Sequence, residues 1–102
     1  MNRVCLNDFI NHVEKIAKVS DKSDYVQDSS GRYNKVTYLE DCIIEAKRLI
    51  AHGECQIALE NMLENLSEVS IQLDKNVVKL ARQAFGMQTP QNIENLLNKL
   101  TK

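Results

Sequence analysis

The segment HGECQIALENMLENLSE, residues 52–68, decides the fold class of this chain. Its apolar residues recur at steps of three and four, and because each helical residue advances by about 100°, they gather on one side of a helix. That inward set is Ala58, Leu59, Met62, Leu63 and Leu66, with Val69 directly after it. The pattern predicts an α-helix from about Glu54 to Val69 with one buried face.

The segment before this helix carries a similar apolar stripe and ends at a residue suited to a sharp corner. TYLE, residues 37–40, has the spacing of a capping box, in which Thr37 accepts from the amide of Glu40 and the Glu40 side chain reaches back. The stripe stops at Gly53, and glycine is favoured just past a helix C-terminus. We therefore expect a second helix and a tight helix-to-helix corner at Gly53.

The N-terminal third combines a helical stretch with a polar one. Residues 6–19 repeat apolar side chains at helical spacing, which predicts a helix with Asn7 as its N-cap. Residues 20–36 are rich in Ser, Asp and Gly and predict a long loop. The side chains available to hold that loop in place are Tyr25, Val26 and Tyr33.

Two shorter helices are predicted in the C-terminal third. Asp74 can cap one that closes at Gly86. TPQNIENLLNKL, which starts at Thr89, places Thr at the N-cap and Pro90 at the first helical position of the other. Five amphipathic helices without a convincing strand predict an all-α fold, a compact bundle with a single domain over residues 1–102.

Composition agrees with a folded helical domain. Hydrophobic residues make up 43% of the 102 residues and charged residues 26%, which excludes global disorder. No apolar run approaches the ~18 residues that a membrane span needs, and the N-terminus has no apolar signal-peptide core. We therefore expect a cytoplasmic chain without membrane contact.

The sequence contains no recognisable catalytic or metal-binding pattern. The three cysteines are irregularly spaced, which favours reduced thiols over a disulfide framework. His52, Cys55 and Cys42 are a conceivable set of metal ligands, but no CxxC pair accompanies them. There is no Gly-rich phosphate loop, and neither His12 nor His52 has an evident nucleophile beside it. We expect no enzyme activity, no metal and no other cofactor.

Charge is distributed unevenly along the chain. Residues 37–74 contain eight acids and two bases, a net of −6, whereas the remainder contains six acids and eleven bases, a net of +5. Glu60, Glu64 and Glu68 lie opposite the apolar face of the central helix, and Asp41 and Glu45 join them if the two helices pack as a hairpin. Like charges at this spacing cost about 0.2–0.5 kcal/mol per pair. We interpret these five acids, called the acidic face, as a surface for a basic partner, with a merely solvated helix face as the alternative.

Two isoleucines fall on the polar sides of their helices. Ile44 and Ile57 point away from the apolar stripes, and an exposed Ile beside acids resembles an interface anchor with a charged rim. Ile57 and Asn61 are expected near the centre of the contact surface. Packing of the isoleucines against the 20–36 loop is the alternative.

Residues 49–86, LIAHGECQIALENMLENLSEVSIQLDKNVVKLARQAFG, resemble small helical immunity proteins of bacterial polymorphic-toxin systems, of the Maf and contact-dependent growth inhibition type. The resemblance lies in a helix end followed by GE, then IALENMLENL, a short SIQLDK connection and one more helix. It implies a non-catalytic protein that binds and neutralises a cognate toxin domain, often a nuclease, in the cytoplasm. Nucleases tend to present a basic cleft, which the acidic face could occupy.

Two other functions stay open. One is a helical adaptor or secretion chaperone that holds a basic or amphipathic segment in a groove between helices. The other is a regulator that contacts nucleic acid through Lys75, Lys79 and Arg82. The adjoining acidic segment repels phosphates, so nucleic acid is not the expected partner.

Overall fold

The computed structural model describes all 102 residues and contains five helices and one small hairpin. In chain order the elements are α1 (Arg3–Val19), β1 (Tyr25–Asp28), β2 (Gly31–Asn34), α2 (Lys35–Ala51), α3 (Cys55–Glu68), α4 (Lys75–Phe85) and α5 (Gln91–Leu100). The prediction of a largely all-α fold with five helices is confirmed.

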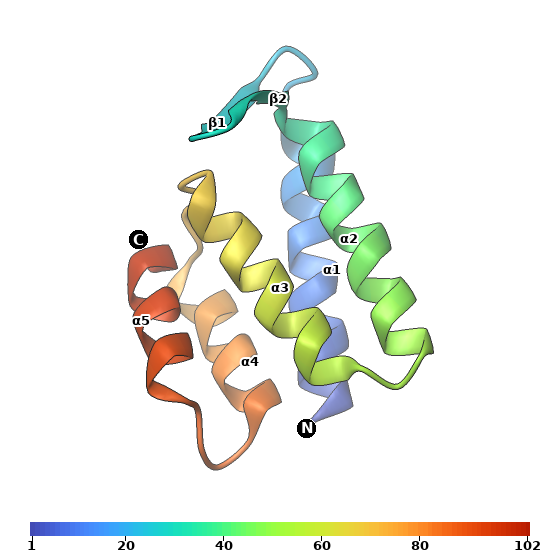
Figure 1. The fold of residues 1–102 in the computed structure, drawn as a ribbon, viewed down its shortest axis with the longest axis vertical. Coiled ribbons are helices and arrows are strands. Elements are labelled where there is room, and N and C mark those ends of the chain that lie inside the picture. The colour runs from blue at the N-terminus through green and yellow to red at the C-terminus, as the bar shows by residue number, and fades with distance from the viewer.

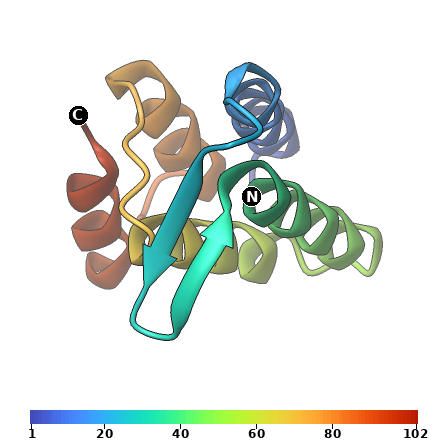
Figure 2. The same ribbon diagram turned by 90° about the horizontal axis from the view of Figure 1, so that it is seen from above.

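The helices close into a ring around one core (Figure 1). α3 lies between α2 and α5, α1 packs against α2 and α4, and α4 touches α5. The hairpin lies across one end of this ring, where it contacts α2 (Figure 2). All 26 buried residues are apolar and form one cluster. Burial of apolar side chains therefore supplies most of the cohesion of the fold.

The corner between α2 and α3 is as tight as the sequence predicts. Gly53 has a φ of 78°, a left-handed conformation that glycine adopts without steric cost. The amide of Glu54 donates to the Leu49 carbonyl over 2.9 Å, and the amide of Gly53 donates to the Ile50 carbonyl over 3.0 Å. These bonds satisfy carbonyls at the end of α2, so α3 can turn back along it.

The N-caps predicted for α1 and α2 are wrong. α1 begins earlier than predicted, with Asn2 as its N-cap, and Asn7 lies inside the helix. α2 is capped by Asn34, whose side chain accepts from the amide of Thr37 over 3.0 Å. The capping box of Thr37 and Glu40 does not form, because the asparagine at the end of β2 already occupies the Thr37 amide.

The two C-terminal helices begin close to their predicted starts. Asp74 stands at the N-cap of α4, but its side chain accepts no capping hydrogen bond. Pro90, and not Thr89, takes the N-cap position of α5, so the predicted start is shifted by one residue. Gly86 ends α4 as predicted, with a φ of 93° and a ψ of −143°, a conformation outside the αL region that glycine adopts without steric cost.

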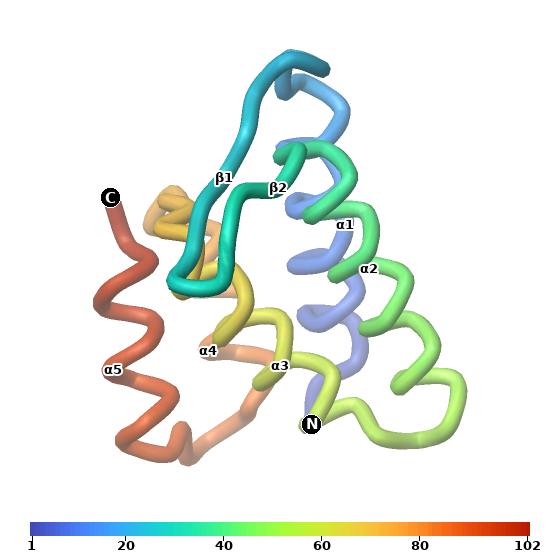
Figure 3. The backbone as a smooth tube through the Cα atoms, turned by 45° about the horizontal axis from the view of Figure 1, so that its top comes forward, coloured from blue at the N-terminus to red at the C-terminus, as the bar shows by residue number.

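Residues 20–36 are not the loop that their composition predicts. β1 and β2 pair antiparallel in this segment, and the Asp28 carboxylate accepts from the amides of Ser30 and Gly31 in the turn. Val26 is the only buried residue of the two four-residue strands, so the apolar alternation that marks a strand is missing. Figure 3 shows β2 running directly into α2, which leaves little of the segment as loop.

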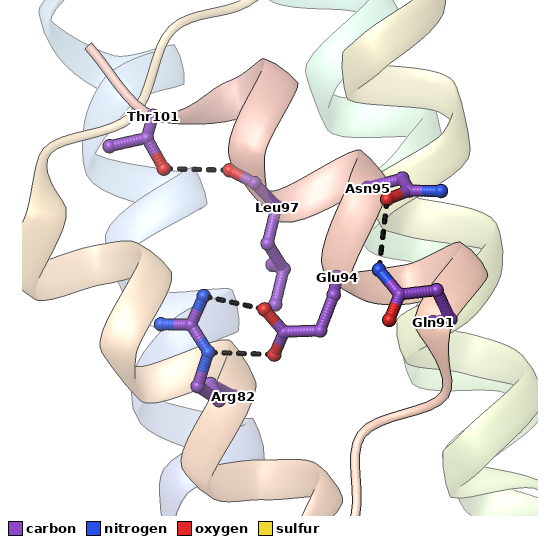
Figure 4. A network of polar contacts seen from close by, with 6 residues as sticks. All are labelled: Arg82, Gln91, Glu94, Asn95, Leu97 and Thr101. Atoms are coloured by element: carbon purple, nitrogen blue, oxygen red, sulfur yellow. Dashed lines mark hydrogen bonds and ion pairs between the residues drawn. The ribbon is translucent and has the colours of Figure 1, made fainter.

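α4 and α5 are joined by an ion pair at the side of the ring (Figure 4). Arg82 donates to both carboxylate oxygens of Glu94, over 2.8 and 3.0 Å. These hydrogen bonds lower the pKa of Glu94. The Thr101 hydroxyl closes α5 with a 2.6 Å bond to the Leu97 carbonyl. The C-terminal pair of helices is thus fixed by polar contacts outside the apolar core.

We expect the ion pair of Arg82 and Glu94 to make stability depend on pH. Since its pKa is lower in the folded chain, Glu94 stabilises the fold above the pKa that it has when unfolded. That contribution is lost as the pH falls through the folded value. Wild-type protein and Glu94→Gln should therefore differ in unfolding free energy by no more than about 1 kcal/mol at neutral pH. This difference should shrink as the pH falls through the lowered pKa of Glu94 in the folded chain.

The measurement is urea unfolding at a series of pH values. Glu40→Gln is the matched control, because Glu40 is exposed and takes part in none of the four ion pairs. The difference in unfolding free energy between Glu40→Gln and wild type should not change with pH in the same way. A Glu94→Gln effect that is constant across the acidic range would contradict a stabilising charge at this position.

Candidate partner-binding site

A pocket of about 420 Å³ opens between the hairpin, α2 and the end of α3. Its lining consists of Asp28 and Tyr33 from the hairpin, Tyr38, Asp41, Cys42 and Glu45 from α2, and Asn65 and Glu68 from α3. We call it the acidic pocket. Four carboxylates and two tyrosines face one small volume, and no lysine or arginine lines it. Such a site is suited to a cationic group.

Local structure explains why these carboxylates converge. Asp41 and Glu45 are four residues apart on α2, so both side chains lie on the same face. Glu68 is the last residue of α3, close to the chain reversal at Ser70, which has a φ of 59°. Asp28 ends β1, where its Oδ1 accepts from the Ser30 amide over 2.8 Å and is held at the tip of the hairpin.

Tyr38 links α2 to the end of α3. Its hydroxyl donates over 2.9 Å to the carbonyl of Asn65, one of the last carbonyls of α3 that lack a partner within the helix. Burial is the largest of the causes that raise the pKa of Tyr38 to about 12. The nearby acidic groups, led by Cys42 and Glu68, also raise this pKa. The ring of Tyr33 lies 5.5 Å from that of Tyr38, at 42°. The two rings form one aromatic wall of the pocket.

Two of the four carboxylates have partners within the chain. Glu45 accepts hydrogen bonds from Arg48 at 2.6 and 2.9 Å, which lower the pKa of Glu45. Hydrogen bonds from Ser30 lower the pKa of Asp28. Neither Asp41 nor Glu68 belongs to any of the four ion pairs. These two carboxylates are therefore free to bind an external cation.

The thiol in the pocket is unsuited to nucleophilic chemistry. Cys42 is buried, and burial together with the charge of Asp41 raises the pKa of its thiol to about 11. Such a thiol stays protonated near neutral pH. No three of the chain's His, Cys, Asp and Glu side chains are arranged to hold a metal ion. The pocket offers charge and aromatic surface for binding.

Three of the seven predicted contact residues line the acidic pocket: Asp41, Glu45 and Glu68. The other four lie elsewhere on α3 and outside the pocket: Ile57, Glu60, Asn61 and Glu64. Ile57 is 47% exposed, and Asn61 and Glu64 are also exposed. Glu60 is half-buried and accepts from the side chain of Gln56 over 3.1 Å. The predicted surface thus continues beyond the pocket along α3.

Sequence reasoning missed the contribution of the hairpin. The pattern DSSG at residues 28–31 is typical of a turn in which aspartate bonds the following amides, and it is the one signal that could have placed Asp28 at a tip. Ile44 is 65% exposed, as expected, but it lies beside Glu14 and Lys47 where α2 meets α1. It therefore does not extend the acidic pocket.

Comparisons with known proteins add no assignment. No protein-family model, no curated protein sequence and no solved structure matches the chain significantly. None of the five helices has both the length and the apolar character that crossing a membrane requires. Function is therefore argued from the surface of the chain itself.

We expect Tyr38 to ionise well above the ordinary pKa of tyrosine. An absorbance titration by rapid pH jump should show a tyrosine step with a pKa of about 12, and Tyr38→Phe should remove that step. The variant should also lose about 1 kcal/mol of unfolding free energy, because the Asn65 carbonyl loses its donor.

The control is Tyr25→Phe, since Tyr25 is 56% exposed and does not line the acidic pocket. It should keep the late step and nearly all of the stability. If the late step instead persists in Tyr38→Phe, the step does not belong to Tyr38 and the prediction is contradicted.

Proposed function

We propose that this protein is a non-catalytic immunity protein that binds and neutralises a cognate toxin domain. The observation that carries the proposal is the acidic pocket, in which Asp41 and Glu68 have no ion-pair partner within the chain. Like charges on one surface repel, and a bound cation converts that repulsion into attraction. The pocket therefore favours a partner that presents a basic side chain.

Arginine is the side chain whose chemistry fits the pocket best. A guanidinium group stacks on aromatic rings and donates in parallel to carboxylates. Tyr33 and Tyr38 supply the rings, and Asp41 and Glu68 supply the carboxylates. The hairpin already uses the same chemistry internally, since the Arg32 guanidinium lies 3.6 Å from the centre of the Tyr25 ring.

A nuclease toxin is the class of partner that meets this requirement. Enzymes that cleave RNA or DNA carry arginines and lysines where phosphates bind. An immunity protein that offers carboxylates to those residues competes with the nucleic acid. The exposed stripe of Ile57, Asn61 and Glu64 would extend the contact along α3. All three cysteines are free, which suits the reducing cytoplasm where such an inhibitor acts.

A helical adaptor or secretion chaperone for a basic partner is the second candidate. It is favoured by the position of the pocket between two helices and the hairpin. The volume of about 420 Å³ suits one large side chain better than a long extended segment, which favours a folded partner. Binding to nucleic acid is disfavoured because Glu94 already engages Arg82, one of the three bases considered for it.

The direct test is a growth experiment. The toxin domain encoded next to this chain in its native locus is expressed with this protein, with an unrelated helical bundle, or alone. Rescue by this protein and not by the unrelated bundle is the expected result. A neighbouring product that is harmless, or that stays lethal despite soluble co-expression, argues against immunity and favours the adaptor.

The role of the acidic pocket is tested by charge reversal. Asp41→Lys combined with Glu68→Lys should slow association with the toxin domain at least tenfold at low salt, because steering charges act mainly on the association rate. Both side chains are exposed, so helix content should not change. Stopped-flow fluorescence at two salt concentrations measures the rates.

The matched control reverses Asp8 and Asp24, which are exposed and lie outside the pocket. It changes the net charge by the same amount. Equal slowing by both double variants would mean that only net charge matters, and unchanged rates in the pocket variant would remove the pocket from the interface.

A further inference from the structure

A second pocket, of about 460 Å³, has the opposite charge. It lies between the second half of α1, the start of α2 and the connection from residue 70 to residue 74. His12 and Lys15 line it from α1, and Lys35 lines it from α2. We call it the basic pocket. It shares no residue with the acidic pocket.

Two of the lysines that line the basic pocket are not neutralised within the chain. Lys15 and Lys35 belong to none of the four ion pairs. The one carboxylate in the lining is Asp74, which pairs with Lys102 over 3.3 Å. An anion that enters the pocket therefore meets unpaired positive charge without displacing an existing partner.

Five of the twelve lining residues are apolar. Ile16 and Val19 come from α1, Ile71 and Leu73 from the connection before α4, and Val77 from α4 itself. Val19 is 84% exposed, whereas Ile16 is half-buried and Ile71 and Val77 are buried. An inorganic anion would leave Val19 and the exposed part of Ile16 in water, and a neutral apolar molecule would leave both lysines unpartnered.

We propose that the basic pocket binds an amphipathic organic anion, a small molecule with one carboxylate and an apolar body. The carboxylate lies between Lys15 and Lys35, and the body covers Val19 and the exposed part of Ile16. The volume falls within the range of about 300–1,000 Å³ typical of small-molecule sites, which combine apolar walls with a few charged groups. This inference does not depend on the immunity function, because it uses other residues.

The test uses a matched pair of probes, 2-naphthoate and its neutral analogue 2-naphthamide. Each is titrated into the ¹⁵N-labelled full chain and followed by amide chemical shifts. Naphthoate should shift the amides of Ile16, Ile71 and Val77 saturably, and naphthamide should bind at least tenfold more weakly. Lys15→Gln combined with Lys35→Gln should bring the affinity for naphthoate down to that for naphthamide.

Two further variants separate charge in the pocket from charge elsewhere. Lys79→Gln combined with Lys99→Gln removes two exposed lysines outside the pocket and should leave naphthoate binding unchanged. Val19→Asp places a negative charge at the exposed rim and should weaken naphthoate binding at least fivefold without unfolding the chain.

Three results would overturn the proposal. Equal affinities for the two probes would show that binding uses the apolar walls of the pocket and not its lysines. Shifts scattered over other residues would place binding elsewhere. Absence of saturable binding by naphthoate, with binding of an acidic peptide to the same amides, would assign the pocket to a protein partner.

Discussion

Each of the five helices is apolar on one side only, and the chain can bury all five sides at once only by closing the helices around one core. No polar or charged residue is buried, so no buried ion pair or hydrogen-bond network shares this task. Full burial of one Leu, Ile or Phe contributes roughly 1.5–3 kcal/mol. The ion pairs on the surface contribute about 1 kcal/mol or less each. Apolar burial decides the fold, and surface charge is left free to vary.

That freedom explains how α3 tolerates three glutamates at like-charge spacing. The two successive pairs from Glu60 to Glu68 cost about 0.2–0.5 kcal/mol each, which is less than the burial of Leu63 alone contributes. A surface that is unfavourable for the isolated helix can therefore persist if binding makes use of it. The same reasoning applies to Lys15 and Lys35, which stand unpaired at the basic pocket.

Helical periodicity predicted what depends on local sequence. The five helices and the corner at Gly53 follow from apolar spacing and from one glycine, and both are confirmed. The N-caps were less predictable, since Asn34 and Thr37 both suit an N-cap and only the path of the chain decides between them. The hairpin escaped prediction because Val26 is its only buried side chain. A strand pair without an apolar face gives no alternation to detect.

The pockets were harder to predict than the helices, for a physical reason. Spacing along α2 could place Asp41 and Glu45 on one face, but only the hairpin adds Asp28 and Tyr33 to them. The basic pocket draws on α1, on Lys35 and on the connection after α3, which are far apart in sequence. Local patterns can place single residues such as Asp28 or Asp41, but no local pattern shows that these residues meet in one pocket.

Local charge, and not the whole-chain value of −1, therefore determines which partners this surface can bind. The molecule extends 39 Å along its longest axis, whereas exposed charges are screened beyond about 8 Å at physiological salt. A basic group at the acidic pocket responds mainly to Asp41, Glu68 and their immediate neighbours. An anion at the basic pocket responds mainly to Lys15 and Lys35. Two sites of opposite sign can thus act on one small, nearly neutral protein without cancelling each other.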